Sequence, residues 1–258
     1  MVIPTSSSVT GRLWAPFLRF KLRMEERACH TMNQHREVMD DMRIEEMTAD
    51  DIRQLAAFCD TALITFGGAS WRPAHLPIGA SWFVLRRLRD ILEGSLGGRI
   101  VTLPVIGINI QGQESAIFQI SQDAATELIR HAIEEIASRL PVRFFVFLTD
   151  SLEAEQAFVQ AINSMAQRND MKHLSYLWWR DGLNEVQAPV YERSGEMETS
   201  LLMSIAKRLI DLEQKSATRH SALLASEEAG NAYWAGLEKS LLEQVQALWM
   251  EGNFKTVV

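Results

Sequence analysis

The sequence is poor in cysteine and lacks the patterns that mark nucleotide-binding and membrane-spanning proteins. Its two cysteines, Cys29 and Cys59, do not form a CxxC pair, which predicts reduced thiols and a cytoplasmic protein. No apolar run approaches the roughly 20 residues that span a bilayer, and no GxGxxG or Walker pattern occurs. The formal net charge of −7 argues against a nucleic-acid partner. We therefore expect a soluble protein without a membrane span.

The first 41 residues differ in composition from the rest of the chain. Within them the piece 12–23 is basic, and apolar side chains such as Trp14, Phe17 and Phe20 are interleaved with its charges. The apolar part is too short and too interrupted for a secretory signal. We predict that residues 1–41 form a basic N-terminal extension that packs on the domain or on a partner subunit; a targeting or surface-binding segment is the alternative. Residues 42–258 are long enough for one α/β domain.

Short apolar runs alternate with helical periodicities along residues 42–258. Strands are predicted at 61–66, 100–108, 142–148 and 173–179, and helices at 48–59, 81–92, 121–140, 153–166, 198–212 and 226–250. Ser81 is a candidate helix cap. The alternation predicts a three-layer αβα domain whose sheet is mainly parallel. Sites in such sheets lie at the carboxyl ends of the strands, so functional residues are expected in the loops after Phe66, Leu148 and Trp179.

The loop after the first strand carries a recognisable frame. It reads Gly67-Gly68-Ala69-Ser70-Trp71-Arg72-Pro73-Ala74-His75-Leu76-Pro77-Ile78-Gly79-Ala80-Ser81. This segment resembles the first metal-binding loop of the creatininase (creatinine amidohydrolase) family, which usually reads G-S-x-E-x-H-G-x-H-L-P-x-G-T-D. The resemblance implies that Ser70, Arg72 and Ser81 stand where the family has a Glu, a His and an Asp that bind a pair of divalent metals.

Later segments extend the resemblance over roughly residues 45–250. Thr149-Asp150-Ser151-Leu152-Glu153 lies where the family has N-G-H-G-G-N, so Asp150 stands for a metal-binding His. Residues 193–200, R-S-G-E-M-E-T-S, are similar to the family's H-A-G-x-x-E-T-S, whose His and Glu assist catalysis. On that match Glu198 is retained and Arg193 replaces the His. Residues 225–230 look like the family's closing A-x-x-E-K-G helix.

These replacements predict that the family's metal site is lost. A dinuclear site needs several anionic or imidazole ligands that converge on two dications. Ser81 is a poor ligand when neutral, and the guanidinium groups of Arg72 and Arg193 are permanent cations without a lone pair to donate. Asp150 and Glu198 alone would rarely hold a transition metal. We therefore assign no metal ligand and expect no cofactor.

Several interpretations of the remaining pocket stay open. It would contain Ser70, Arg72, His75, Asp150, Glu153, Arg193, Glu196 and Glu198. The arginines and acids could neutralise one another as salt bridges that fill an abandoned metal site, or the arginines could hold a carboxylate or phosphate by their bidentate geometry. A metal bound elsewhere, for instance through His75 and Glu153, is a third alternative. A Ser70–His75 hydrolase is disfavoured because no acid is arranged beside the pair.

The sequence therefore favours a divergent creatininase-like protein that has lost metal-dependent amide hydrolysis, which would make it a pseudoenzyme. It would act as a non-hydrolytic partner of an active paralogue or as a small-anion binder, in a homo-oligomer such as the hexamer that the resemblance implies. The rival is a metal-free enzyme acting on an amide or carboxylate small molecule, with Glu198 or Asp150 as general base. The candidate substrate-binding residues are Arg72, Arg193, His75, Ser70, Trp178 and Trp179. The tryptophan pair is alternatively part of the core or of a subunit interface.

Overall fold

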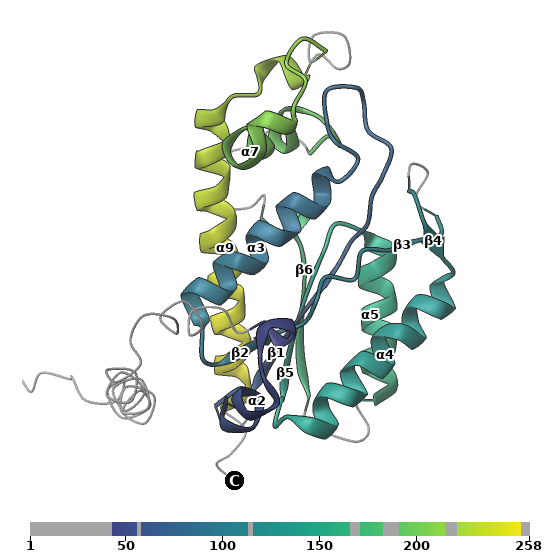
Figure 1. Cartoon of the computed structure of the whole chain (residues 1–258), viewed down its shortest axis with the longest axis vertical. Helices are drawn as coiled ribbons and strands as arrows, with labels where there is room; N and C mark the ends of the chain where they lie inside the picture. The colour runs from purple at the N-terminus through teal and green to yellow at the C-terminus, as the bar shows by residue number, and fades with distance from the viewer. Residues whose placement is uncertain are drawn as a thin grey trace, which may run out of the picture.

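A four-stranded parallel sheet lies at the centre of the structure. The computed structural model describes residues 43–55, 58–112, 116–165, 171–182, 191–214 and 221–253. The sheet contains β1 (Thr61–Phe66), β2 (Ile100–Thr102), β5 (Phe144–Thr149) and β6 (Lys172–Leu177), and a separate parallel pair consists of β3 (Asn109–Ile110) and β4 (Gln119–Ile120). The strand order in the larger sheet is β2-β1-β5-β6 (Figure 1). Its two central strands pair along their whole length, from Thr61 opposite Phe144 to Phe66 opposite Thr149.

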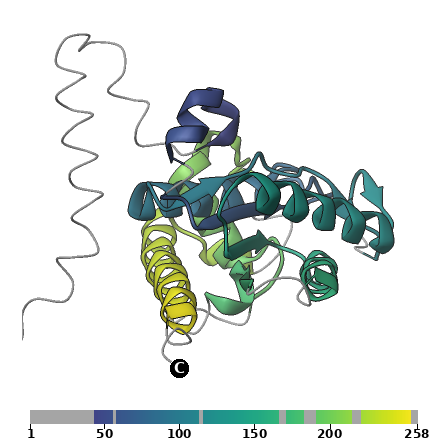
Figure 2. The same ribbon diagram turned by 90° about the horizontal axis from the view of Figure 1, so that it is seen from below.

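Helices cover both faces of this sheet. They are α3 (Ala80–Leu96), α4 (Gln122–Arg139), α5 (Leu152–Met165), α7 (Glu196–Ala206) and α9 (Glu227–Asn253). Residues of α3, α7 and α9 pack on the sheet face that carries Leu63 and Val146, whereas α4 and α5 pack on the face that carries Ile64 and Phe147. The yellow helix α9 lies on the opposite side of the molecule from α4 and α5 (Figures 1 and 2). The predicted three-layer αβα fold with a parallel sheet is confirmed.

Burial on both faces explains the uniformly apolar central strands. All six residues of β1 and all six of β5 are buried. Continuous apolar runs of this kind are typical of parallel sheets with helices on each side. The loops that follow β1 and β5 therefore begin at strand ends that are fully buried.

The strand predicted at 100–108 is shorter than expected. β2 ends at Thr102, and Pro104 follows two residues later. Proline has no N–H to donate to a strand ladder. The chain returns to the sheet only at Ile106, whose amide donates to the carbonyl oxygen of Thr65 over 2.9 Å.

Two expectations near the site were wrong. Ser81 does not cap α3: the cap position is Gly79, and Ser81 lies inside the first turn. Trp178 and Trp179 do not end a strand either, because β6 stops one residue earlier and the pair opens the short helix α6 (Trp178–Asp181).

The remaining helices lie close to their predicted positions. Thr48 caps α2 (Ala49–Leu55), since its hydroxyl accepts a hydrogen bond from the Asp51 amide over 3.2 Å. The helix predicted at 198–212 begins at Glu196 and ends at Ala206. The described residues also include the 3-10 helices η1 (Ile44–Glu46), η3 (Lys207–Leu209) and η4 (Ser221–Leu224).

Arg43 ties the start of the described chain to α3. Its guanidinium donates to Glu93 over 3.0 Å and to Asp90 over 2.8 Å. The Glu93 side chain is only 1% exposed, so this ion pair is largely shielded from water. The basic extension predicted over residues 1–41 lies outside the described residues and stays a prediction.

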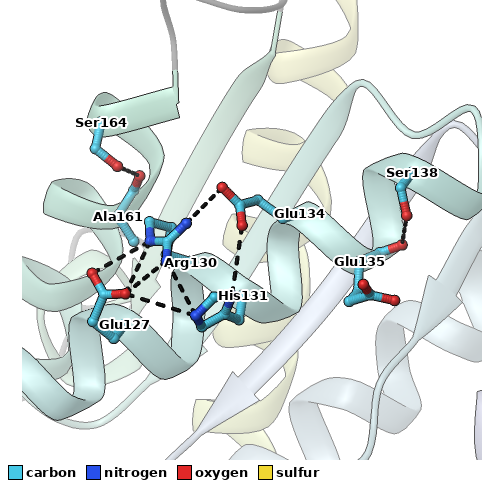
Figure 3. Close-up of polar contacts among 8 residues, drawn as sticks. All are labelled: Glu127, Arg130, His131, Glu134, Glu135, Ser138, Ala161 and Ser164. Atoms are coloured by element: carbon cyan, nitrogen blue, oxygen red, sulfur yellow. Dashed lines mark hydrogen bonds and ion pairs between the residues drawn. The ribbon is translucent and has the colours of Figure 1, made fainter.

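The outer face of α4 is lined with paired charges (Figure 3). Arg130 lies 2.7 Å from Glu127 and 2.6 Å from Glu134, three residues before and four residues after it. Such pairs support a solvated helix face. Within the described ranges, no helix is both long and apolar enough to cross a bilayer.

Candidate functional site

Three loops meet at the carboxyl ends of β1 and β5. Arg72, in the loop after β1, contacts Glu198 in the first turn of α7. Arg193, just before α7, contacts Ser70 in the loop after β1. The loops comprise residues 67–79, 150–151 and 191–195. Residues more than 120 positions apart in the chain are thereby brought together.

Arg72 and Glu198 form an ion pair that is closed to solvent. Nη2 of Arg72 lies 2.9 Å from Oε1 of Glu198, and Nη1 donates to Oε2 over 3.1 Å. The two side chains are 1% and 0% exposed. Nη2 also donates to the hydroxyl of Ser81 over 2.5 Å. A guanidinium therefore lies where the resemblance expects metal ligands, and it is neutralised by the retained acid.

The backbone at the start of α7 stabilises the negative charge of Glu198. Gly195 is the cap residue, so Glu198 lies in the first turn, where a carboxylate interacts favourably with the helix amides. The amide of Ser194 donates to Oε2 of Glu198 over 2.7 Å. Ser194 has a φ of 62°, a left-handed value that is uncommon for a residue other than glycine.

Arg193 differs from Arg72 in having few partners. Its Nη2 donates to the hydroxyl of Ser70 over 2.9 Å, and its side chain is half-buried. No carboxylate among the described residues lies within ion-pair distance of it. A guanidinium carries five N–H donors, and only one of them has a hydrogen-bond partner among the described residues.

Asn109 holds the loop that carries Ser70. Its side-chain amide donates to the carbonyl oxygens of Ala69 and Ile117, over 2.5 and 2.7 Å. A Cβ at Gly68 would come within 2.9 Å of three atoms of this amide group, so the close approach requires glycine. Asn109 was not among the sequence candidates, because a single asparagine at a strand start gives no distinctive signal.

Asp150 presents an unsatisfied carboxylate oxygen beside Gly67. Oδ1 is buried and has no hydrogen-bond partner among the described residues. A Cβ placed on Gly67 would lie 3.1 Å from this oxygen and 2.4 Å from Cδ1 of Leu85. The backbone oxygen of Asp150 accepts a hydrogen bond from Nε1 of Trp179 over 2.9 Å, which fixes the loop after β5.

Tyr191 is a site residue that the sequence analysis missed. Its ring stacks on Trp179 at 5.1 Å between centroids and meets Trp178 edge-on at 5.3 Å. Burial raises the pKa of the Tyr191 phenol, and the nearby negative charges of Glu198 and Asp150 raise it further, against the opposing arginines. The phenol therefore stays protonated at neutral pH. Its position two residues before Arg193 was the one signal available.

Other candidates lie away from solvent or point elsewhere. His75 and Trp178 are 0% exposed, and Nε2 of His75 lies 3.1 Å from the Thr199 hydroxyl. Glu196 accepts a hydrogen bond from the Tyr233 hydroxyl over 2.8 Å, and Glu153 accepts one from Ser151. Arg72, Arg193, Ser70, Asp150, Glu198 and Trp179 are the sequence candidates that lie together with Tyr191.

The residues at this location do not fit a pair of divalent metals. The cationic Arg72 already fills the space between Glu198 and Ser81. In the part of the chain that the structure describes, no group of three or more His, Cys, Asp and Glu side chains could hold a metal ion. His75 contacts α7 and Glu153 lies in the first turn of α5; these helices pack on opposite faces of the sheet, so the two residues are not brought together.

Comparison with known proteins agrees with this architecture. The family model described as creatinine amidohydrolase (creatininase) matches residues 45–245. A crystal structure of creatinine amidohydrolase is 17% identical, with a TM-score of 0.66 over 80% of this chain and 98% of that one. A mutant creatininase complexed with creatine is 14% identical, with a TM-score of 0.67 over 82% and 99%. No curated protein sequence matches the chain. The resemblance drawn from the loop frames is confirmed, and the chain belongs to the creatininase family.

Proposed function

We propose that this protein is a divergent creatininase-family member that has lost the dinuclear metal site and binds a small anion without metal-dependent hydrolysis. The observation that carries the proposal is the half-buried Arg193, whose only contact among the described polar groups is the neutral hydroxyl of Ser70. A guanidinium in this state offers a fork of donors that matches a carboxylate or phosphate. Arg193 is thus the proposed anion-binding residue.

The buried Arg72 has a different proposed role. Glu198 and the Ser81 hydroxyl already occupy both of its terminal nitrogens. The pair is neutral as a whole, which removes the need for an external cation beside Glu198. We propose that the Arg72–Glu198 ion pair is structural and holds the loop after β1 against α7. We propose that the buried His75 fixes the same loop.

Thermal melts test the anion proposal. Phosphate and succinate should raise the melting temperature of the wild type by binding linkage. Arg193→Met should remove this rise, whereas Arg139→Met, a change at an exposed position on α4, should leave it unchanged. An equal rise in all three proteins would show a general salt effect, and no rise in the wild type would refute anion binding.

Asp150 supports a second candidate, an enzyme with metal-free chemistry on an amide or carboxylate substrate. Its Oδ1 is the better candidate for a general base, because Glu198 is paired with the Arg72 guanidinium and its Oε2 also accepts hydrogen bonds from Arg72 and the Ser194 amide. Assays for turnover of small amides and carboxylates would distinguish this metal-free enzyme from a non-hydrolytic anion-binding protein. Activity that survives chelator and is abolished in Asp150→Asn would establish the enzyme.

We also propose self-association, or assembly with an active paralogue. Trp71 and Phe118 are 69% and 78% exposed, and the bridge between Ser70 and Ala116 joins their two segments. Exposed apolar groups that gather in one region often mark interfaces. Light scattering should give a mass well above the 29.2 kDa of one chain, and a monomer would refute self-association.

A further inference from the structure

The outer face of α3 carries two arginines and two aromatic rings, which we call the α3 patch. Arg86 and Arg87 are exposed, and Trp82 and Phe83 are half-buried. The two rings meet edge-on at 5.3 Å between centroids, and the Arg86 guanidinium lies 5.4 Å from the centre of the Trp82 ring. Neither arginine has a carboxylate partner among the described residues. The α3 patch is therefore a positively charged surface with an apolar part.

The described chain begins beside this patch. Arg43 lies 2.8 Å from Asp90 and 2.9 Å from Glu93, which fixes it against the second half of α3. The Glu93 side chain is 1% exposed, so water does not compete strongly for this attachment. Arg87 precedes Asp90 by three residues, which is about 5 Å along a helix. The residues just before position 43 must therefore start next to the α3 patch.

Residues 37–42 have a composition that complements this surface. They read E-V-M-D-D-M, with three acids, three apolar side chains and no base. Chain geometry places Asp41 and Asp40 at most about 7 and 11 Å from Arg43 in any conformation. The first residue of the segment can extend to about 20 Å from Arg43, whereas Trp82 precedes the anchored turn of α3 by about 12 Å. The segment is therefore long enough to cover the whole patch.

We propose that the α3 patch is the docking surface for residues 37–42 of the same chain. Asp40 and Asp41 pair with Arg86 and Arg87, and the apolar side chains of the segment pack on the two aromatic rings. Each part of the patch thereby receives a partner of matching chemistry. This inference concerns a face outside the candidate site and does not depend on anion binding.

Other occupants match the α3 patch less well. The piece 12–23 of this chain is basic, so the two arginines would repel it. A segment of a separate protein would have to compete with one that is already tethered beside the patch, and tethering raises the effective concentration greatly. Because α3 begins directly after the loop that follows β1, docking in this direction leads residues 1–36 toward the end of the domain that carries the candidate site.

Charge reversal tests the proposal in the full chain. Subtilisin, a protease of broad specificity, is added to native protein, and mass spectrometry gives the rate of cleavage within residues 37–42. That rate tracks the undocked fraction of the segment. An exposed ion pair shifts such an equilibrium by at most about fivefold. Arg86→Glu/Arg87→Glu should therefore speed cleavage by about three- to tenfold, while Arg139→Glu on α4 should not change it.

A second pair of variants shows whether the charges face each other. Asp40→Lys/Asp41→Lys should also be cleaved quickly. Combining these two changes with Arg86→Glu/Arg87→Glu should restore slow cleavage, because opposite charges meet again. The comparison is matched, since the cleaved sequence is the same with and without the α3 substitutions. A variant that merely unfolds would not be rescued in this way.

Three outcomes would overturn the proposal. One is equally fast cleavage of the wild type and of Arg86→Glu/Arg87→Glu. Another is a fourfold variant that is cleaved as fast as Asp40→Lys/Asp41→Lys. The third is protection that disappears when the protein is diluted, because docking within one chain does not depend on protein concentration. That result would assign the α3 patch to a contact with a second copy.

Discussion

Arg72 and Glu198 lie 2.9 Å apart in an ion pair that joins the β1 loop to the start of α7 and is shut off from solvent. Breaking a buried pair by removing one partner is far more costly than replacing both, because the remaining charge has no water to solvate it. The pair therefore gives the sharpest stability prediction for this protein.

Replacing Arg72 with methionine should lower the free energy of unfolding by about 3–5 kcal/mol, since Glu198 is left as an uncompensated buried acid. The double variant Arg72→Met/Glu198→Leu should recover a large part of that loss. Urea unfolding curves measure both, with Arg139→Met as an exposed control. A single variant as stable as wild type would show that the pair does not hold the loop.

Metal content is the second prediction. The purified protein should carry well under one equivalent of zinc or manganese, because a guanidinium in the centre of the site repels dications. Elemental analysis of protein prepared without chelator measures this. Two stoichiometric equivalents would contradict the proposed loss of the metal site.

The third prediction concerns the ionisation of the tyrosine side chains. The chain has three tyrosines. Burial raises the pKa of Tyr176 and of Tyr233 to about 12, and it raises the pKa of Tyr191 as well. An ultraviolet titration of the native protein should therefore show little tyrosinate near pH 10, whereas the urea-unfolded protein should titrate at about 10.

The same shifts fix the sign of the alkaline stability change. Each folded-state pKa lies above the unfolded value, so the folded protein binds more protons than the unfolded chain once the pH exceeds about 10. Stability should be unaffected by these groups below that pH and should fall above it. Tyr191→Phe should reduce the slope of that fall, and an unchanged slope would show that Tyr191 is solvated.

Gly67 provides the fourth prediction. Gly67→Ala places a methyl group 2.4 Å from Cδ1 of Leu85 and 3.1 Å from Oδ1 of Asp150, which should destabilise the protein by about 1–3 kcal/mol. The matched control is Gly94→Ala in α3, where nothing lies within 4 Å of the new methyl group. Because alanine favours helix, that control should be neutral or more stable by about 0.5–1 kcal/mol. Equal effects of the two substitutions would contradict the packing beside Asp150.

The sequence by itself determined the layered fold and its family. Continuous apolar runs such as 61–66 are typical of strands covered by helices on both faces, and the spacing of the His75-Leu76-Pro77 frame is recognisable from the sequence alone. It also predicted that Ser70, Arg72 and Ser81 are poor replacements for the family's metal ligands, an expectation that rests on side-chain chemistry alone. Element ends were less predictable: Pro104 shortens β2, and α6 begins at Trp178.

Only the tertiary structure decided how the charges are shared. The motifs place two arginines beside several acids, and the sequence cannot say which of them touch. In the fold, Arg72 forms an ion pair with Glu198, and Glu196 accepts a hydrogen bond from Tyr233. Oδ1 of Asp150 is buried without a hydrogen-bond partner among the described residues. The physical reason is that an ion pair needs contact within a few ångströms, and such contacts between residues over 120 positions apart depend on where the packed sheet and α7 place each backbone.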